Sequence, residues 1–191
     1  MDTISAPPPT VVLLACVFVV WVLAGLADWW CHRRTGIEST SGIVEVGLHF
    51  VLLVEIGILL AAFVFFEINA LVLAATGVVV VLHLLTSYAD TSYAWRRRSI
   101  GPFEQHVHSV LDFAPAMVWM LIALLEHDAL RVLWNGDGTV DDWRLSLRET
   151  PLPTAWIALV IGGAVLGNVI PFFEEFLRTV RHGSSHERDR G

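Results

Sequence analysis

The feature that most constrains this chain is a series of five apolar segments, which cover residues 11–34, 41–66, 70–95, 103–125 and 152–177. A helix needs roughly 20 residues to cross the hydrocarbon core of a membrane, and each segment is long enough. Apolar residues surround each segment on all sides, which excludes ordinary amphipathic surface helices. We therefore expect an all-α, polytopic membrane bundle of five transmembrane helices, forming a single domain over residues 1–181.

Arginine predicts the orientation of this bundle. The chain has no lysine, and nine of its 12 basic residues lie on one side of the alternating topology. The other three lie in the long acidic loop 127–150, where a short interfacial helix is expected around 140–148. Because basic flanks favour the cytosol, we expect the N-terminus and this loop outside, and the C-terminus, with a disordered tail over 182–191, in the cytosol of a plasma or inner membrane.

Composition excludes two classes of protein. Acidic residues outnumber basic residues by 19 to 12, so the chain lacks the basic face of a nucleic-acid binder. Its two cysteines, Cys16 and Cys31, form no CxxC pair. A disulfide framework or a sulfur-rich metal site is therefore not expected.

Each of the first four apolar segments carries both a carboxylate and a histidine at membrane depth, where ionisable groups are costly and usually functional. Within each segment they are spaced i,i+4 or i,i+7 and share one helix face. They lie at the end of the first and third segments and at the start of the second and fourth, so all should meet at the cytosolic end. The set is Asp28, His32, Glu45, His49, His83, Asp90, Glu104, His108 and Asp112.

Imidazole and carboxylate together suit iron, zinc or manganese, and inward-pointing Glu and His ligands from four helices are typical of di-metal bundles. His83 and Asp90 are about 10 Å apart along their helix, too far to bind one ion. Two metal ions are therefore expected, in a deeper layer and a shallower layer. The deeper layer is Asp28, His49, His83 and Asp112; the shallower layer is His32, Glu45, Asp90, Glu104 and His108. A buried polar network or a proton path is the alternative.

Other polar residues near these faces have different expected roles. Glu55 lies off the face of His49 and is a candidate catalytic acid, proton relay or hydrogen-bond partner of a ligand, and Tyr93 is a further catalytic candidate. His106 should point away from the site, although ligation by it stays open. Glu174 and Glu175 are expected to form an interfacial helix end. Hydrogen bonds to the ligands are expected from Ser87, Tyr88, Tyr93 and Arg97.

The distribution of polar groups favours an enzyme. The outer halves of the first four segments are almost entirely apolar, which argues against a metal-ion transporter, and six buried carboxylates argue against haem. A site walled by apolar helices can receive a hydrophobic, lipid-like substrate from the bilayer. Iron would activate dioxygen for hydroxylation or desaturation with an electron donor, whereas zinc would activate water to hydrolyse a lipid amide or ester.

The arrangement resembles the integral-membrane di-iron oxygenases of the fatty-acid hydroxylase and desaturase type, which hold a cytosol-facing metal centre on transmembrane helices. The resemblance is one of architecture, because Asp/Glu-x-x-x-His pairs and His106-Val-His108 stand here in place of the HxxxH and HxxHH boxes of those families. It implies a di-iron oxidoreductase. The zinc hydrolases of the ceramidase and adiponectin-receptor type are the alternative, but they have seven spans and few carboxylates.

Overall fold

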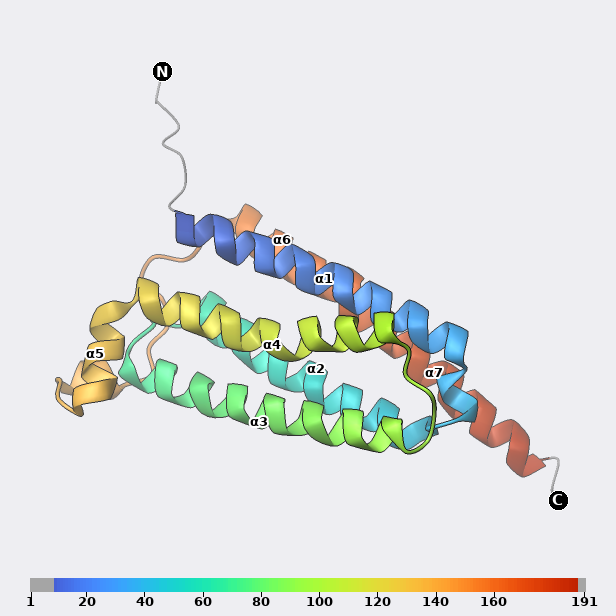
Figure 1. Ribbon diagram of the computed structural model, residues 1–191. Coiled ribbons are helices and arrows are strands. Elements are labelled where there is room, and N and C mark those ends of the chain that lie inside the picture. Colours follow the sequence, from blue (N-terminus) through green and yellow to red (C-terminus); the bar gives the residue numbers. More distant parts are fainter. Residues whose placement is uncertain (1–8, 189–191) are drawn as a thin grey trace.

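The computed structural model describes residues 9–188, which form a bundle of long helices (Figure 1). Within this range no strand occurs beyond one isolated bridge between Phe66 and Leu147. Five helices are long and apolar enough to cross a membrane, which confirms the expected all-α polytopic bundle. The first four are α1 (Pro9–Thr35), α2 (Gly42–Phe65), α3 (Ala70–Trp95) and α4 (Pro102–Leu125).

The fifth long helix has three parts, which are α6 (Thr154–Ala164), the π-helical turn η3 (Val165–Val169) and α7 (Ile170–Arg188). The predicted and observed ends of the first four helices differ by at most two residues. The fifth helix differs more, because it continues beyond residue 182, where a disordered tail was expected. Residues 182–188 contain no proline that would end the helix. Residues 189–191 of the expected tail lie outside the described residues.

The ends of the helices follow from local sequence. The side chain of Asn69 accepts a hydrogen bond from the backbone N–H of Val72 and so caps the start of α3. Pro102 occupies the first turn of α4, where its missing N–H costs nothing. Between α1 and α2 the chain turns through Gly36, whose positive φ of 64° suits glycine.

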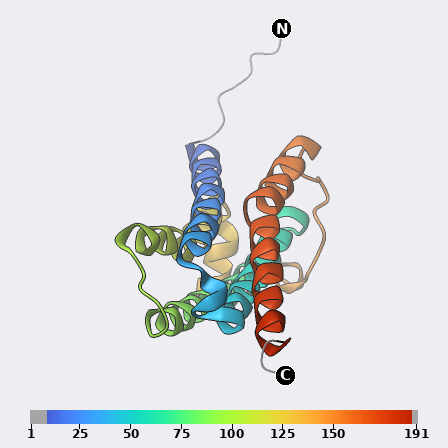
Figure 2. The ribbon, with the colours of Figure 1, turned by 90° about the vertical axis from the view of Figure 1, so that its right-hand side faces the viewer.

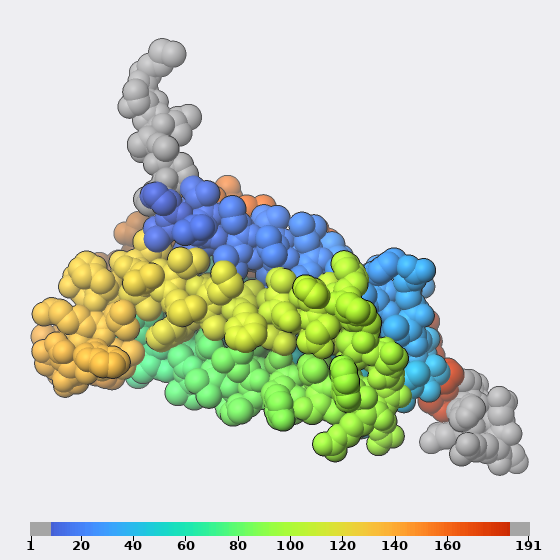
Figure 3. All heavy atoms as spheres, viewed as in Figure 1, coloured from blue at the N-terminus to red at the C-terminus, as the bar shows by residue number. Residues whose placement is uncertain are grey.

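The first four helices alternate in direction, with α1 packed along α4, α2 along α3, and α7 against both α1 and α2. The ends of α1 and α3 and the starts of α2 and α4 therefore gather at one end of the bundle, on the right of Figure 1. Figure 2 looks onto that end, with α7 (red) along one side of it. In the space-filling view, α1, α4 and α3 lie against one another in successive bands (Figure 3).

Small residues bring η3 close to α1. A Cβ atom added to Gly167 would lie 2.4 Å from the Val22 side chain, and one added to Gly25 would lie 1.8 Å from Oδ1 of Asn168. Such contacts between glycine faces are typical of membrane helices. They place Asn168, which is 1% exposed, inside the bundle.

The opposite end of the bundle carries α5 (His127–Asn135) and the 3₁₀ turn η2 (Val140–Trp143). The helix expected over 140–148 therefore stops at Trp143, and α5 was not predicted. Residues beyond the turn are extended instead, because they satisfy backbone groups at the end of α2. The N–H of Arg148 donates to the carbonyl oxygen of Phe65 over 2.9 Å, and Leu147 forms the bridge to Phe66.

Candidate metal centre

Three buried histidines from three helices meet at the shared end of the bundle. They are His32 on α1, His49 on α2 and His108 on α4, and none is more than 5% exposed. The rings of His32 and His49 are stacked, with centroids 4.8 Å apart and planes 4° from parallel. The ring of His108 lies edge-on to that of His32, at 6.1 Å.

One carboxylate holds the two stacked rings in place. Oε2 of Glu175 lies 2.8 Å from Nδ1 of His32, and Oε1 of the same side chain lies 2.9 Å from Nδ1 of His49. Because a carboxylate accepts, each Nδ1–H donates, which leaves the lone pair of a neutral ring on Nε2. A carboxylate that orients a histidine in this way is a common outer partner in metal sites.

Glu175 corrects the sequence analysis, in which it was an interfacial helix end. The residue is 0% exposed, because α7 packs against α1 and α2 and turns this side chain toward His32 and His49. Its neighbour Glu174 behaves as expected at an interface and bonds to Trp29 and Arg33. The one sequence signal for Glu175 was its position at the same expected end of the bundle as the carboxylates and histidines of the first four segments.

A first potential metal group forms where the Nε2 atoms of His32 and His108 face carboxylates. Oδ1 of Asp28 lies 3.5 Å from Nε2 of His32 and 2.9 Å from Nε2 of His108. Oε1 of Glu104 lies 3.7 Å and 4.0 Å from the same two nitrogens. Asp28, His32 and His108 place one ligand atom each within 4.8 Å of one another, close enough to hold an ion.

A second group forms around His49. Its Nε2 atom lies 3.4 Å from Oδ2 of Asp90 and 4.0 Å from Oε1 of Glu45. The same Glu45 oxygen lies 3.9 Å from Nε2 of His32, so one carboxylate oxygen is about equally far from the Nε2 atoms of both stacked rings. Within residues 9–188, neither Nε2 of His32 nor Oδ1 of Asp90 has a hydrogen-bond partner. Orphaned buried atoms of this kind fit a site that takes a metal.

Arg98 enters the cluster from the connector between α3 and α4. Its Nη2 atom donates to Oε1 of Glu45 over 2.6 Å, and Nη1 donates to Glu104. Burial disfavours the guanidinium charge, but hydrogen bonds and charge attraction from the two glutamates raise its pKa above the ordinary value. From sequence alone Arg98 is expected among the cytosolic flanking arginines, because nothing in the Arg96–Arg98 run shows which one folds inward.

The charges of the cluster are unbalanced as protein alone. Five buried carboxylates surround the histidines, and Arg98 is the one cation within hydrogen-bond reach among the described residues. With neutral histidines this leaves four negative charges, which two divalent ions would balance. Uncompensated buried charge is strongly destabilising, so the cluster needs either metal or protonated histidines. The five carboxylates belong to Asp28, Glu45, Asp90, Glu104 and Glu175.

Two residues of the expected deeper layer lie apart from both groups. Nδ1 of His83 lies 3.2 Å from Oε2 of Glu55, and the hydroxyl of Thr86 donates to Oε1 of the same glutamate over 2.8 Å. Asp112 is half-buried. His83 and Asp112 line a cavity of about 50 Å³ that also borders Asp28, His49 and His108. The layers therefore divide differently, since Asp28 and His49 join the shallower residues.

The remaining candidates lie outside the cluster. The Tyr93 hydroxyl donates to the carbonyl oxygen of Ser41 over 3.2 Å, which occupies it away from the histidines. Tyr88 is 75% exposed, and the Arg97 guanidinium stacks over Tyr93. His106 is exposed and bonds through Nδ1 to the carbonyl oxygen of Pro102, so it points away as expected.

Protein-family models, curated proteins and solved structures give no match to this chain. Function is therefore inferred from the site. The buried His, Asp and Glu groups could hold metal, with nitrogen and oxygen donors only, because neither cysteine belongs to them.

Proposed function

We propose that the chain is an integral-membrane metalloenzyme that binds two metal ions, with iron favoured, and oxidises a hydrophobic substrate. The observation that carries this proposal is the position of Glu45, whose Oε1 atom lies 3.9 Å and 4.0 Å from the Nε2 atoms of His32 and His49. A carboxylate oxygen beside two nitrogen donors could serve as a ligand together with either histidine, so Glu45, His32 and His49 would help to hold two neighbouring ions. Glu175 supports it from the other side by fixing both rings.

The donor set favours iron among the metals considered. Imidazole nitrogen and carboxylate oxygen serve iron, zinc and manganese, whereas the absence of thiolates from the groups removes the softest competitors. A high ratio of carboxylate to histidine is typical of di-iron bundles. Zinc bound alone would instead fit a hydrolase of lipid amides or esters.

The residues around the cluster suit oxidation of a C–H bond. When bound, the metal would supply the activation of dioxygen. In hydroxylation one oxygen atom enters the C–H bond and the other leaves as water, so a separate electron donor provides two electrons, and two protons are taken up. His83 lines the cavity beside the cluster and is paired with Glu55, so this pair is placed to hold and pass protons.

We also propose the sidedness of the protein from its arginines. The cluster lies at the helix ends that Arg33, Arg34, Arg96 and Arg97 flank, and under the positive-inside rule these arginines favour the cytosolic side. The N-terminus and α5 then lie outside. A cytosolic electron donor would reach the cluster from the end that Arg98 closes.

Elemental analysis of the purified chain, combined with its absorption spectrum, tests this proposal. We expect two iron ions per chain and no Soret band. His49→Ala should lose most of the metal, whereas His127→Ala, in the exposed start of α5, should keep it. Zinc alone would favour the hydrolase, a Soret band would indicate haem, and metal accumulation inside vesicles would indicate a transporter. Full metal content in His49→Ala would contradict the site.

A further inference from the structure

An unpartnered amide lies beside the proposed metal centre. Asn168 is 1% exposed, and its Nδ2 atom has no hydrogen-bond partner within residues 9–188. The residue lines the same cavity of about 50 Å³ as Asp28, His49 and His108. A buried amide donor without a partner is costly, so its retention calls for an acceptor from outside the chain.

The backbone around Asn168 is specialised to hold it there. The residue belongs to η3, and π-helical turns of this kind occur frequently at functional sites. Its Oδ1 atom packs against Gly25, where a Cβ atom would lie only 1.8 Å away. The amide is therefore held close to α1 beside the cavity, in a space that any larger residue at position 25 would fill.

An apolar groove adjoins this cavity. It has a volume of about 240 Å³ and lies between α2 and the α6–η3 segment, lined by residues that include Gly57, Ala61, Ile161 and Val165. Trp21, Leu53 and Ile56 line both the groove and the cavity, so the two spaces meet at these side chains. Gly57 is exposed, and a Cβ added to it would meet nothing within 4 Å.

We propose that the cavity and the groove form one binding site for a long-chain alcohol or aldehyde. The Nδ2–H of Asn168 donates to the single oxygen of this ligand, and its unbranched hydrocarbon chain lies between α2 and α6. This inference rests on the proposed function, because it places the oxygen-bearing carbon beside the metal centre as the substrate.

The size and charge of the two spaces select this chemistry. A cavity of about 50 Å³ admits a hydroxyl or carbonyl end but is too small for a phospholipid head group. A free carboxylate is disfavoured, because Asp28 and Asp90 line the same cavity and repel a second negative charge. The lining of the groove is apolar throughout, as a hydrocarbon chain requires.

Photolabelling of the full chain in phosphatidylcholine nanodiscs tests this inference. The probes are a 1-hexadecanol and a hexadecane that carry the same diazirine in the chain. We expect the alcohol to label peptides of α2 and α6, and excess unlabelled 1-hexadecanol, but not hexadecane, to suppress the labelling. Asn168→Leu should remove the preference for the alcohol.

Matched glycine variants test the groove itself. Gly57→Leu should reduce labelling by the alcohol about tenfold, equivalent to about 1.4 kcal/mol of binding free energy. Gly47→Leu should leave it unchanged, because Gly47 is an exposed residue of the same helix with open space around its Cβ position, and it does not line the groove.

Equal labelling by both probes in the wild-type chain would mean that bulk lipid alone fills the groove, and it would overturn the inference. Labelling that persists in Gly57→Leu would do the same. Metal content is measured in each preparation, so the two proposals can fail separately. A metal-free wild-type chain that still prefers the alcohol would overturn the metalloenzyme but support the binding site.

Discussion

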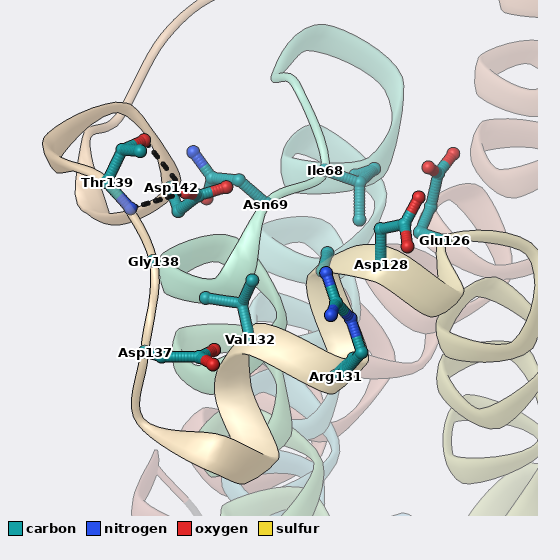
Figure 4. A pocket seen from close by; sticks show the side chains of 11 residues that line it. Ile68, Asn69, Glu126, Asp128, Arg131, Val132, Asp137, Gly138, Thr139 and Asp142 are labelled. Carbon is teal, nitrogen blue, oxygen red and sulfur yellow. Dashed lines mark hydrogen bonds between the residues drawn. The ribbon is translucent and has the colours of Figure 1, made fainter.

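The two ends of this bundle are both rich in acidic residues, but the carboxylates are buried at one end and surround an open hollow at the other. At the end where α1 to α4 meet, five carboxylates are buried among three histidines. At the other end, carboxylates from α4 to η2 surround an open hollow of about 510 Å³ (Figure 4). Its acidic lining residues are Glu126, Asp128, Asp137 and Asp142, and no histidine lines it.

The acidic residues of the α5 end are hydrated or hydrogen-bonded locally, since Glu126, Asp128 and Asp137 are exposed. Asp142 is half-buried and accepts hydrogen bonds from the backbone N–H and the hydroxyl of Thr139, at 2.7 Å and 2.8 Å (Figure 4). This is a capping box at the start of η2. Acid content alone therefore does not mark a metal site. What distinguishes the buried end is the removal of carboxylates from water together with imidazoles that face them.

Replacing one carboxylate at each end should give the largest contrast. Glu45→Gln keeps the size of the side chain but removes the charge beside the Nε2 atoms of His32 and His49, so we expect near-complete loss of bound metal. Asp142→Asn should leave the metal content at the wild-type value, because that residue lies at the opposite end. Elemental analysis of both variants in parallel provides the measurement. Equal metal content would remove the proposed distinction between the two ends.

Replacing Glu175, which hydrogen-bonds to His32 and His49, should have a smaller effect on metal binding. Glu175→Gln retains a hydrogen bond to one ring but cannot accept from both, and loss of such a partner typically weakens metal affinity about 10–100-fold. Glu174→Gln is the matched control, since its side chain is the adjacent one and bonds only to residues near the surface. Metal titration of the two purified variants would decide between them. Similar affinities would show that Glu175 does not orient the ligands.

The smallest expected effect is the local titration of Asp142, at the end of the bundle that carries α5. Hydrogen bonds from the backbone and hydroxyl of Thr139 lower the pKa of Asp142 below its ordinary value of 3.8. A lowered pKa means that the ionised carboxylate stabilises η2 above that value, and that this contribution is lost as the pH falls through the folded-state pKa. NMR titration of the Thr139 amide should therefore show a midpoint below 3.8.

Asp142→Asn should abolish this titration, whereas Asp137→Asn, in the same hollow, should preserve it. A midpoint at or above 3.8 in the wild-type chain would show that the capping box does not form. Neither variant should change the metal content, because Asp137 and Asp142 lie at the end of the bundle opposite the metal centre.

Periodicity and span length were enough to predict the five helices and the meeting of their polar faces. Asp28, His32, Glu45 and His49 lie i,i+4 on their own helices, so local geometry fixes which side they share. What sequence could not provide was how the fifth long helix packs against α1 and α2 and how the connector between α3 and α4 folds. Glu175, Arg98 and Asn168 reach the site through those long-range contacts.

The deeper layer shows the same limit. Ideal helices placed His83 and Asp112 level with Asp28 and His49, but the structure pairs His83 with Glu55, six residues beyond His49 on α2. Relative height between helices depends on where each begins in space, which the spacing within one helix does not encode. The apolar segments fixed the class of fold, while ligand grouping depended on tertiary contacts.

X-ray absorption of the iron-loaded chain tests the central claim most directly. If Glu45 and the histidines hold two ions, the ligands should be nitrogen and oxygen alone, and a metal–metal vector of about 3.5–4 Å, as in two-metal sites, should be visible. The same vector should disappear in Glu45→Gln. A first shell that contains sulfur, or an isolated metal without a neighbour in the wild-type chain, would contradict the proposed two-metal centre.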